Sequence, residues 1–433
     1  MRLLLRFTVA SLIFSAWILQ AGPAFGQAGT LDTTFGNGGV TVTTLTTASA
    51  SNSAIPYAIA LQTATGLPTT GDILVLAIVT TTGAGASTTT EVLGYTPAGA
   101  LDSKFGSEGI ARLPAVLGPP AMAVQSNGQI VVVGADNSSV LAAERLNANG
   151  TVDTTFGNAG LASTDLNCCG TEMAVAVEPD SGDIIACTQL EPTGRRQPFH
   201  TALARFLSTG DVDPTFGTDG VVNVAGVGGC AAVAVLSTGE ILIENGPSAQ
   251  FTPSGVQEST VTGGTILASG GSENPPSIGT LFLPDGDYLA AEEIFTGEES
   301  RAHNAAAQVV RFTVAGETDT SFTSAPFHFA GSGGSGIEAQ PNAIAVQANG
   351  DIVVVGEQTT SNQSGSVTVN GLARLASSGE LDTTFGTGGT VTNSVPSGTE
   401  GLNGVLIDSQ GRIVTVGLAN SFTSITVSRY LSQ

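Results

Sequence analysis

The sequence is poor in basic residues and in the large aromatic residues Trp and Tyr. Its 433 residues hold 13 Lys and Arg against 36 Asp and Glu, a formal net charge of −23 at pH 7. A surface of that sign repels nucleic acid and anionic lipid, so we expect neither as a partner. The single Trp, Trp17, and four Tyr offer few aromatic platforms for a sugar, which argues against a lectin.

The usual sequence signatures of catalytic and metal sites are also missing. The chain has no Ser nucleophile elbow, no phosphate-binding loop and no zinc-ribbon spacing of Cys. Its three His residues, His200, His303 and His328, show no His-x-His or Glu-x-x-His spacing. We therefore expect no cofactor and no metal site, and a binding role is favoured over an enzymatic one.

Only one apolar run is long, and it lies at the start of the sequence. Residues 1–26 combine the basic residues Arg2 and Arg6, an apolar stretch over 7–22 and small residues ahead of Gln27. This pattern predicts a secretory signal peptide, because the stretch is too short and wrongly flanked for a membrane span. The mature protein is expected to be periplasmic or extracellular and to have no transmembrane segment.

A short motif, Asp-x-Thr-Phe-Gly, recurs about every 58 residues, a little above the periods typical of propellers and solenoids. A worn seventh copy, Gln257 to Thr262, has Glu258 in place of Asp and Val261 in place of Phe. The six clear copies carry Asp32 and Phe35, Asp102 and Phe105, Asp153 and Phe156, Asp213 and Phe216, Asp319 and Phe322, and Asp382 and Phe385.

Each repeat is interpreted as four short strands. The first is rich in small residues, a Gly turn follows, and the second is almost wholly apolar, as expected of a strand covered on both faces. No linker interrupts residues 27–433, and part of one repeat lies at each end, as in a ring. The sequence predicts an all-β, seven-bladed β-propeller of four-stranded blades. The N-terminal strand Val40–Thr43 would complete the last blade by pairing with Ser424–Tyr430.

The motif residues have predicted structural roles. Asp caps the amides of the following turn, Phe packs between blades, and Gly lets the chain swing into the outer strand. The third strand ends in an Arg eight residues before the Asp, so we predict that the two pair. The predicted pairs are Arg145 with Asp153, Arg205 with Asp213, Arg311 with Asp319 and Arg374 with Asp382, and ring closure would place Arg429 beside Asp32.

The extended pattern Gly-x-Leu-Asp-x-Thr-Phe-Gly, preceded by two apolar strands around an Asn-Gly or Asp-Gly turn, resembles the delta-60 repeat. That repeat belongs to propeller-type proteins, most of them exported from bacteria. The resemblance covers residues 29–433 and implies architecture and export. The family brings no agreed catalytic residues, so none is carried over. A calcium or phosphate role for the motif is disfavoured, because each copy offers one carboxylate and the copies are spread around a ring.

Function is therefore sought in what does not repeat. The long inserts all connect the second strand to the third or the fourth to the next first, so they open on the same face of the predicted propeller, where binding is usually built. They are Thr43–Pro56, Gln189–Pro198, Gly263–Pro276, Glu293–Asn304, Gly331–Pro341 and Gln358–Gly365. The chemically richest residues in and beside them, taken as candidate binding residues, are Arg195, Arg196, His200, Phe295, Arg301 and His303.

The Arg residues of these inserts reverse the sign of charge locally, which predicts an anionic ligand or an acidic partner. Neutralisation of nearby Glu residues explains them equally well. The sequence thus indicates an exported scaffold that binds an unidentified protein or small molecule. The alternative is a secreted propeller enzyme of lyase or hydrolase type that uses the same face.

Four Cys in an exported chain are disulfide candidates. Cys168 and Cys169 precede the first strand of the third repeat, Cys187 lies in its second strand, and Cys230 precedes the first strand of the fourth. A bridge from the Cys168 and Cys169 pair to Cys230 would tie neighbouring blades, but the sequence leaves every pairing open.

Overall fold

The structure, a computed structural model, describes most of the chain from Gln27 onward. All regular secondary structure in the described residues is β-strand. The predicted signal peptide, 1–26, lies outside them. The described residues are 27–45, 52–83, 86–113, 115, 118–136, 138–167, 173–190, 200–224, 229–244, 248–260, 279–295, 305–331, 336–362, 365–393, 399–420 and 422–433.

Four of the sheets are antiparallel meanders of four strands that follow chain order. The first contains β2 (Ser53–Leu61), β3 (Ile73–Thr81), β4 (Ser87–Tyr95) and β5 (Ile110–Leu113). The next contains β6 (Ala121–Val124), β7 (Ile130–Ala135), β8 (Val140–Leu146) and β9 (Leu161–Asn167). The other two are β10 (Met173–Val177), β11 (Ile184–Leu190), β12 (His200–Phe206) and β13 (Val221–Val224), and β14 (Ala232–Val235), β15 (Ile241–Glu244), β16 (Ala249–Phe251) and β17 (Gln257–Thr260).

A fifth four-stranded sheet combines the two ends of the described chain, in the order β1-β27-β26-β25. In β1 (Val40–Thr44), Val40 lies opposite Ser428 and Thr44 opposite Ser424. The predicted pairing of this strand with Ser424–Tyr430 is confirmed. The three C-terminal strands are β25 (Thr399–Ile407), β26 (Ile413–Ala419) and β27 (Ser424–Tyr430).

The remaining sheet has seven strands and differs from the expected unit. Only one parallel residue pair, Ala305 opposite Glu338, joins its first three strands to its last four. Where a fourth strand was expected after β20, Phe327 forms a single bridge to Ala307. The neighbouring Pro326 has no amide to donate, which limits pairing there. The strands are β18 (Gly279–Phe282), β19 (Tyr288–Phe295), β20 (Ala305–Phe312), β21 (Ile337–Val346), β22 (Ile352–Asn362), β23 (Gly365–Leu375) and β24 (Thr390–Asn393).

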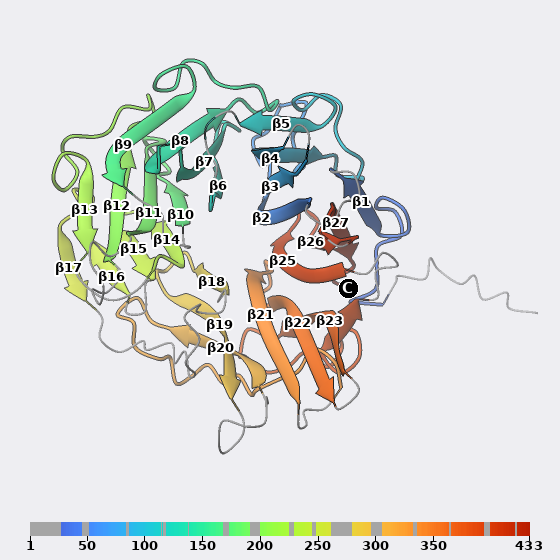
Figure 1. Cartoon of the computed structure of the whole chain (residues 1–433). Helices are drawn as coiled ribbons and strands as arrows, with labels where there is room; N and C mark the ends of the chain where they lie inside the picture. Colours follow the sequence, from blue (N-terminus) through green and yellow to red (C-terminus); the bar gives the residue numbers. More distant parts are fainter. Residues whose placement is uncertain are drawn as a thin grey trace, which may run out of the picture.

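The sheets surround a common centre, with β2, β6, β10, β14, β18, β21 and β25 innermost (Figure 1). This arrangement of antiparallel sheets is that of a β-propeller. The innermost strands are built largely from small residues and are half-buried, as in β6 and β14. The next strands outward, such as β7 and β26, are buried along their whole length because a sheet packs on either side.

The core lies between sheets, and a motif Phe stands in each of five interfaces. Phe105, for example, packs with Leu74 and Leu76 of its own sheet and with Ile130 and Val132 of the next. Burying such a side chain contributes roughly 2 to 3 kcal/mol. The predicted role of the Phe as a plug between blades is confirmed for the fully buried Phe35, Phe105, Phe156, Phe216 and Phe385, whereas Phe322 is half-buried.

Two of the expected loop inserts include strand residues. The stretch Gln358–Gly365 forms the end of a long hairpin, because β22 continues to Asn362 and β23 starts at Gly365. Thr and Val on both strands give this segment the β-branched composition that suits pairing. Similarly, β21 begins at Ile337, within the insert predicted for Gly331–Pro341. Among the described residues, no helix has the length and apolar character needed to cross a bilayer.

Candidate functional site

The recurring motif forms a structural joint rather than a pocket. The Oδ1 of Asp153 accepts hydrogen bonds from the amide of Thr155 at 3.1 Å and from its hydroxyl at 2.6 Å. The same Asp cap closes the turns after Asp32, Asp213, Asp319 and Asp382. It confirms the predicted role of the Asp and leaves its second oxygen, Oδ2, for another partner.

That second partner is the Arg at the end of the third strand. Arg145 donates to Oδ2 of Asp153 at 2.8 Å, and its guanidinium lies 4.5 Å from the ring centre of Phe156. A further N–H reaches across to the next sheet and donates to the carbonyl of Ser208 at 2.6 Å. One buried side chain therefore holds the turn, the ring and the neighbouring sheet together.

The predicted Arg–Asp pairing is confirmed in every copy for which it was made. The salt bridges of Arg205, Arg374 and Arg311 to their Asp partners measure 2.5, 2.6 and 3.6 Å. Arg429 lies 2.9 Å from Asp32, as the end-to-end pairing of the chain requires. The long Arg311 distance has a cause: its guanidinium turns toward Asp287, at 2.8 Å.

The motif Gly completes the joint by donating to the next sheet. The amide of Gly157 bonds the carbonyl of Thr209 at 2.8 Å. A Cβ on Gly210, whose φ is +94°, would lie only 2.3 Å from the nitrogen of Gly157, so position 210 requires Gly. We call this set of Asp, Arg, Phe and Gly contacts the motif joint.

The motif joint also sets the charge of its Asp residues. Burial alone would raise the pKa of Asp153, but hydrogen bonds from Thr155 and Arg145 outweigh it and hold the pKa below its ordinary value. The pKa values of Asp32, Asp213 and Asp382 are lowered for the same reasons. These carboxylates are fully engaged inside the protein, so we exclude them as ligand-binding groups.

The strand connections opposite the short Gly turns define a loop-bearing end. His200 opens β12 there and is half-buried, and Phe295 closes β19 with 50% of its surface exposed. Because β12 and β19 belong to sheets separated by the β14–β17 sheet, these two residues come from different parts of the ring. Arg195, Arg196, Arg301 and His303 lie outside the described residues, so their predicted clustering stays a prediction.

Carboxylates that sequence reasoning did not single out lie at this same end. Burial raises the pKa of Glu292 and of Glu357, and burial together with the charge of Glu338 raises that of Glu293. Glu292 and Glu293 lie in β19, Glu338 in β21 and Glu357 in β22. No repeat signal marks them, because each occurs in one unit only.

A groove of about 820 Å³ runs along the outside of the ring, beside β24. Its walls include the 326–331 segment, Thr390 and Val391 of β24, and Gln27 and Thr30. His328 lies in the wall between the buried Phe327 and Phe329, so its side chain faces the groove while the two Phe rings pack inward. Burial lowers the pKa of His328. No motif or spacing in the sequence indicates this groove.

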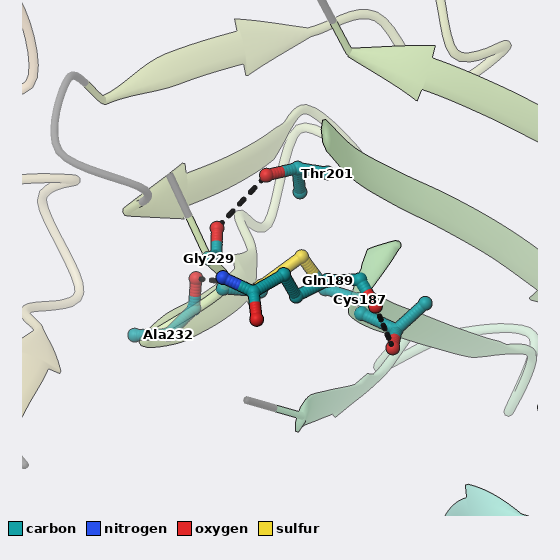
Figure 2. Close-up of a disulfide and its surroundings, with 7 residues drawn as sticks. Cys187, Gln189, Thr201, Gly229 and Ala232 are labelled. Atoms are coloured by element: carbon teal, nitrogen blue, oxygen red, sulfur yellow. Dashed lines mark hydrogen bonds between the residues drawn. A yellow bond between two sulfur atoms is a disulfide. The ribbon is translucent and has the colours of Figure 1, made fainter. Parts of the chain in front are cut away.

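Cys187 and Cys230 form a disulfide between the β10–β13 and β14–β17 sheets (Figure 2). It resolves one of the pairings that the sequence left open and excludes the bridge from Cys168 or Cys169 to Cys230. Both sulfur-bearing residues are buried among Ile185, Ile243 and the motif Phe216. Cys168 and Cys169 themselves lie outside the described residues. The bond strengthens an interface that already has a motif joint.

Within the part of the chain that the structure describes, no group of three His, Cys, Asp or Glu residues is arranged to hold a metal ion. At the loop-bearing end, Glu293 and Glu338 lie close enough for the charge of Glu338 to raise the pKa of Glu293. The described chemistry of that end is therefore that of acids with raised pKa values.

Comparison with known proteins supports the fold. A family model described as "Domain of unknown function (DUF5122) beta-propeller" matches residues 125–156 and 347–385. Each match spans the second and third strands and one motif, from Gln125 to Phe156 and from Gln347 to Phe385. No curated protein matches the sequence.

Three solved structures of different functions are similar to this chain at low identity. A mannose phosphorylase from Leishmania mexicana is 9% identical, with 89% of this chain and 86% of that chain covered and a TM-score of 0.32. The Pan2 WD40 domain of Neurospora crassa is 8% identical, with coverage of 88% and 90% and a TM-score of 0.42. The polysaccharide lyase Uly1 is 10% identical, with coverage of 83% and 88% and a TM-score of 0.40. At these scores none of them indicates a ligand or activity for this chain.

Proposed function

We propose that this chain is an exported seven-bladed propeller with delta-60-type repeats, closed by β1, that serves as a binding scaffold through its loop-bearing end. The strands β18–β20 and β21–β24 would be two separate blades that touch only through Ala305 and Glu338. Export rests on the signal-peptide pattern of residues 1–26.

The observation that carries the binding role is the contrast between the two ends of the strands. At the short-turn end, the repeated polar residues form hydrogen bonds and salt bridges within motif joints. For instance, both oxygens of Asp153 accept hydrogen bonds, and Arg145 donates both to Asp153 and to the next sheet. At the opposite end the connections differ from unit to unit in length and composition. Variation on a rigid support is how repeat scaffolds acquire a specific partner.

The partner we propose is one that carries anionic groups, an acidic peptide segment being the simplest case. Arg195, Arg196, Arg301 and His303 would supply the attraction against an otherwise negative surface. The described carboxylates of β19, β21 and β22 oppose such binding, so the cations must outweigh Glu292 and Glu293 locally. Association would therefore be salt-sensitive.

The test uses a fluorescent oligo-glutamate peptide as probe and the secreted mature protein. Arg195→Ala/Arg196→Ala and Arg301→Ala/His303→Ala should each weaken binding about tenfold, with an unchanged melting temperature. Arg112→Ala is the matched control, since this Arg is 63% exposed on the outer strand β5. If both double variants bound the peptide with the affinity of the parent, and Arg112→Ala weakened binding instead, the proposed site would be refuted.

One observation favours the enzymatic alternative. The half-buried Glu293 has its pKa raised by burial and by the charge of Glu338, and a carboxyl that stays protonated nearer neutral pH suits a general acid. If the chain is a lyase or hydrolase that uses this residue, Glu293→Gln should abolish its turnover while leaving the fold intact. Turnover retained by Glu293→Gln would remove Glu293 from the alternative.

A further inference from the structure

The β2–β5 sheet has a motif Asp without the Arg that accompanies it elsewhere. Gly94 occupies the Arg position in β4, and a Cβ there would lie 2.6 Å from Cγ of Phe105. The Phe105 ring thus lies against the bare strand, and a side chain at position 94 would collide with it. Among the described residues, Asp102 forms no salt bridge.

The bond that Arg makes to the next sheet is nevertheless preserved. Thr69 donates its hydroxyl to the carbonyl of Ala148 at 3.1 Å. Ala148 holds the same place in its turn as Ser208, the carbonyl that Arg145 reaches from the β6–β9 sheet. The amide of Gly106 still bonds the carbonyl of Asn149, at 2.7 Å. Only the positive charge of the joint has been lost.

A second acid takes the place of that charge. Asp72, immediately before β3, is 2% exposed, and it faces the motif Asp102, which is 6% exposed. In the β6–β9 sheet the residue at the same place, Gln129, donates to Oδ2 of the motif Asp153 at 2.7 Å. A hydrogen bond between two carboxyls requires a proton on one of them. The Oδ2 of Asp72 is buried and receives no donor from the described residues. If both were ionised, the two carboxylates would face each other with no salt bridge to either among the described residues.

We propose that Asp72 and Asp102 share one proton near neutral pH, and that this acid pair makes the contact between the β2–β5 and β6–β9 sheets pH-sensitive. In the joint of the β2–β5 sheet, where Gly94 leaves no room for Arg, a proton on the acid pair takes the place of the guanidinium charge. Its effect is confined to that joint, because the other motif Asp residues that pair with Arg are held ionised.

The electrostatic surroundings of Asp72 agree with this assignment. Burial, the hydrogen bond and the charge of Asp102 together raise the pKa of Asp72 to about 7. Lys104 is the charged group that opposes them, and it does not offset the rise. Because the pKa is raised in the folded state, the pair stabilises fully below the ordinary Asp pKa of about 3.9, and that stability is lost as pH rises to about 7.

The motif Asp residues that pair with Arg have the opposite dependence in a different range. Their folded pKa values are lowered, so their contribution is present above about pH 3.9 and is lost only as pH falls further. The interval from about pH 4 to 7 therefore isolates Asp72 from them. Other groups with shifted pKa values, such as Glu293 and His328, also contribute to the pH dependence of stability. Their contribution cancels when a variant is compared with the parent.

The experiment compares the full mature chain with Asp72→Asn, which keeps the shape and donates to Asp102 at any pH. The parent's unfolding equilibrium constant should rise about tenfold per pH unit, relative to the variant, between about pH 4.5 and 6.5. The infrared difference spectrum of the parent minus Asp72→Asn at pH 6 should contain the band of a buried protonated carboxyl.

Asp351→Asn is the matched control, because Asp351 holds the equivalent place before β22 but lies 3.9 Å from Arg374. It should keep the parental pH slope and infrared band. A parental slope and band in Asp72→Asn would overturn the proposal. So would a calcium-dependent rise in melting temperature at pH 7.5 that Asp72→Asn abolishes, since the pair would then hold a cation rather than a proton.

Discussion

The β6–β9 and β14–β17 sheets show what the motif contributes to a unit of this propeller. In the first, the third strand β8 runs from Val140 to Leu146 and ends in the Arg of a complete motif joint. In the second, the third strand β16 spans only Ala249–Phe251, Gln250 stands in place of the Arg, and the pairing register shifts beside it. Loss of the joint accompanies a shorter and less regular strand.

The contact after the β14–β17 sheet is made in a different way. The hydroxyl of Ser248 donates to that of Tyr288 at 2.7 Å, and the Tyr288 ring stacks on Phe312 with centroids 4.8 Å apart. Tyr288, Phe312 and Ala290 form the small buried cluster of this region. An aromatic contact thus replaces a charged joint, which shows that the motif is one solution to blade packing and that single units can abandon it.

Removing a complete joint together with its strand should have the largest effect. Deletion of residues 27–45 removes β1, Asp32 and Phe35, and leaves the edge of β27 unpaired. An exposed edge strand promotes association, so the truncated protein should aggregate or lose cooperative unfolding in size-exclusion and thermal measurements. Val42→Thr, which alters an exposed side chain within β1, is the control. A monomeric truncation with the parental melting temperature would contradict closure by β1.

Single substitutions sharpen the comparison between the two sheets. Arg145→Ala leaves Asp153 buried without its partner and removes the bond to Ser208, which should cost about 3 to 5 kcal/mol of unfolding free energy. Gln250→Ala, at the same place in the β14–β17 sheet, should change it by about 0.5 kcal/mol or less. Chemical denaturation measures both. Equal losses would mean that the motif joint adds no specific stability.

Much of the fold was predictable because the same motif and strand pattern recur in each repeat. The Asp cap, the Phe plug and the Arg–Asp pairs were inferred from recurrence, and the structure contains each of them. The pairing of β1 with β27 followed from the divided repeat at the two ends. Recurrence did not identify Asp72, since an acid before the second strand is ordinary in other units.

The rest depended on contacts between units that no single repeat encodes. The partner of Cys230 is set by how two sheets face each other, which brings Cys187 rather than Cys168 or Cys169 against it. The groove beside β24 likewise arises where the 326–331 segment and residues 27–30 meet. Of the candidate binding residues, only His200 and Phe295 are placed, so the binding site remains a proposal from sequence.

The smallest expected effect concerns the aromatic contact that replaces the joint. Tyr288→Phe keeps the ring on Phe312 but leaves the buried Ser248 hydroxyl without its acceptor, which should cost about 1 to 2 kcal/mol. Because no motif joint also holds this interface together, the loss of stability in Tyr288→Phe should appear as faster amide hydrogen exchange in β14 and β18. Tyr95→Phe is the matched control, since it removes a 2.8 Å bond to Thr43 beside a complete joint. Its local exchange should stay near the parental rate, and equal acceleration in both variants would mean that the two interfaces are equally secured.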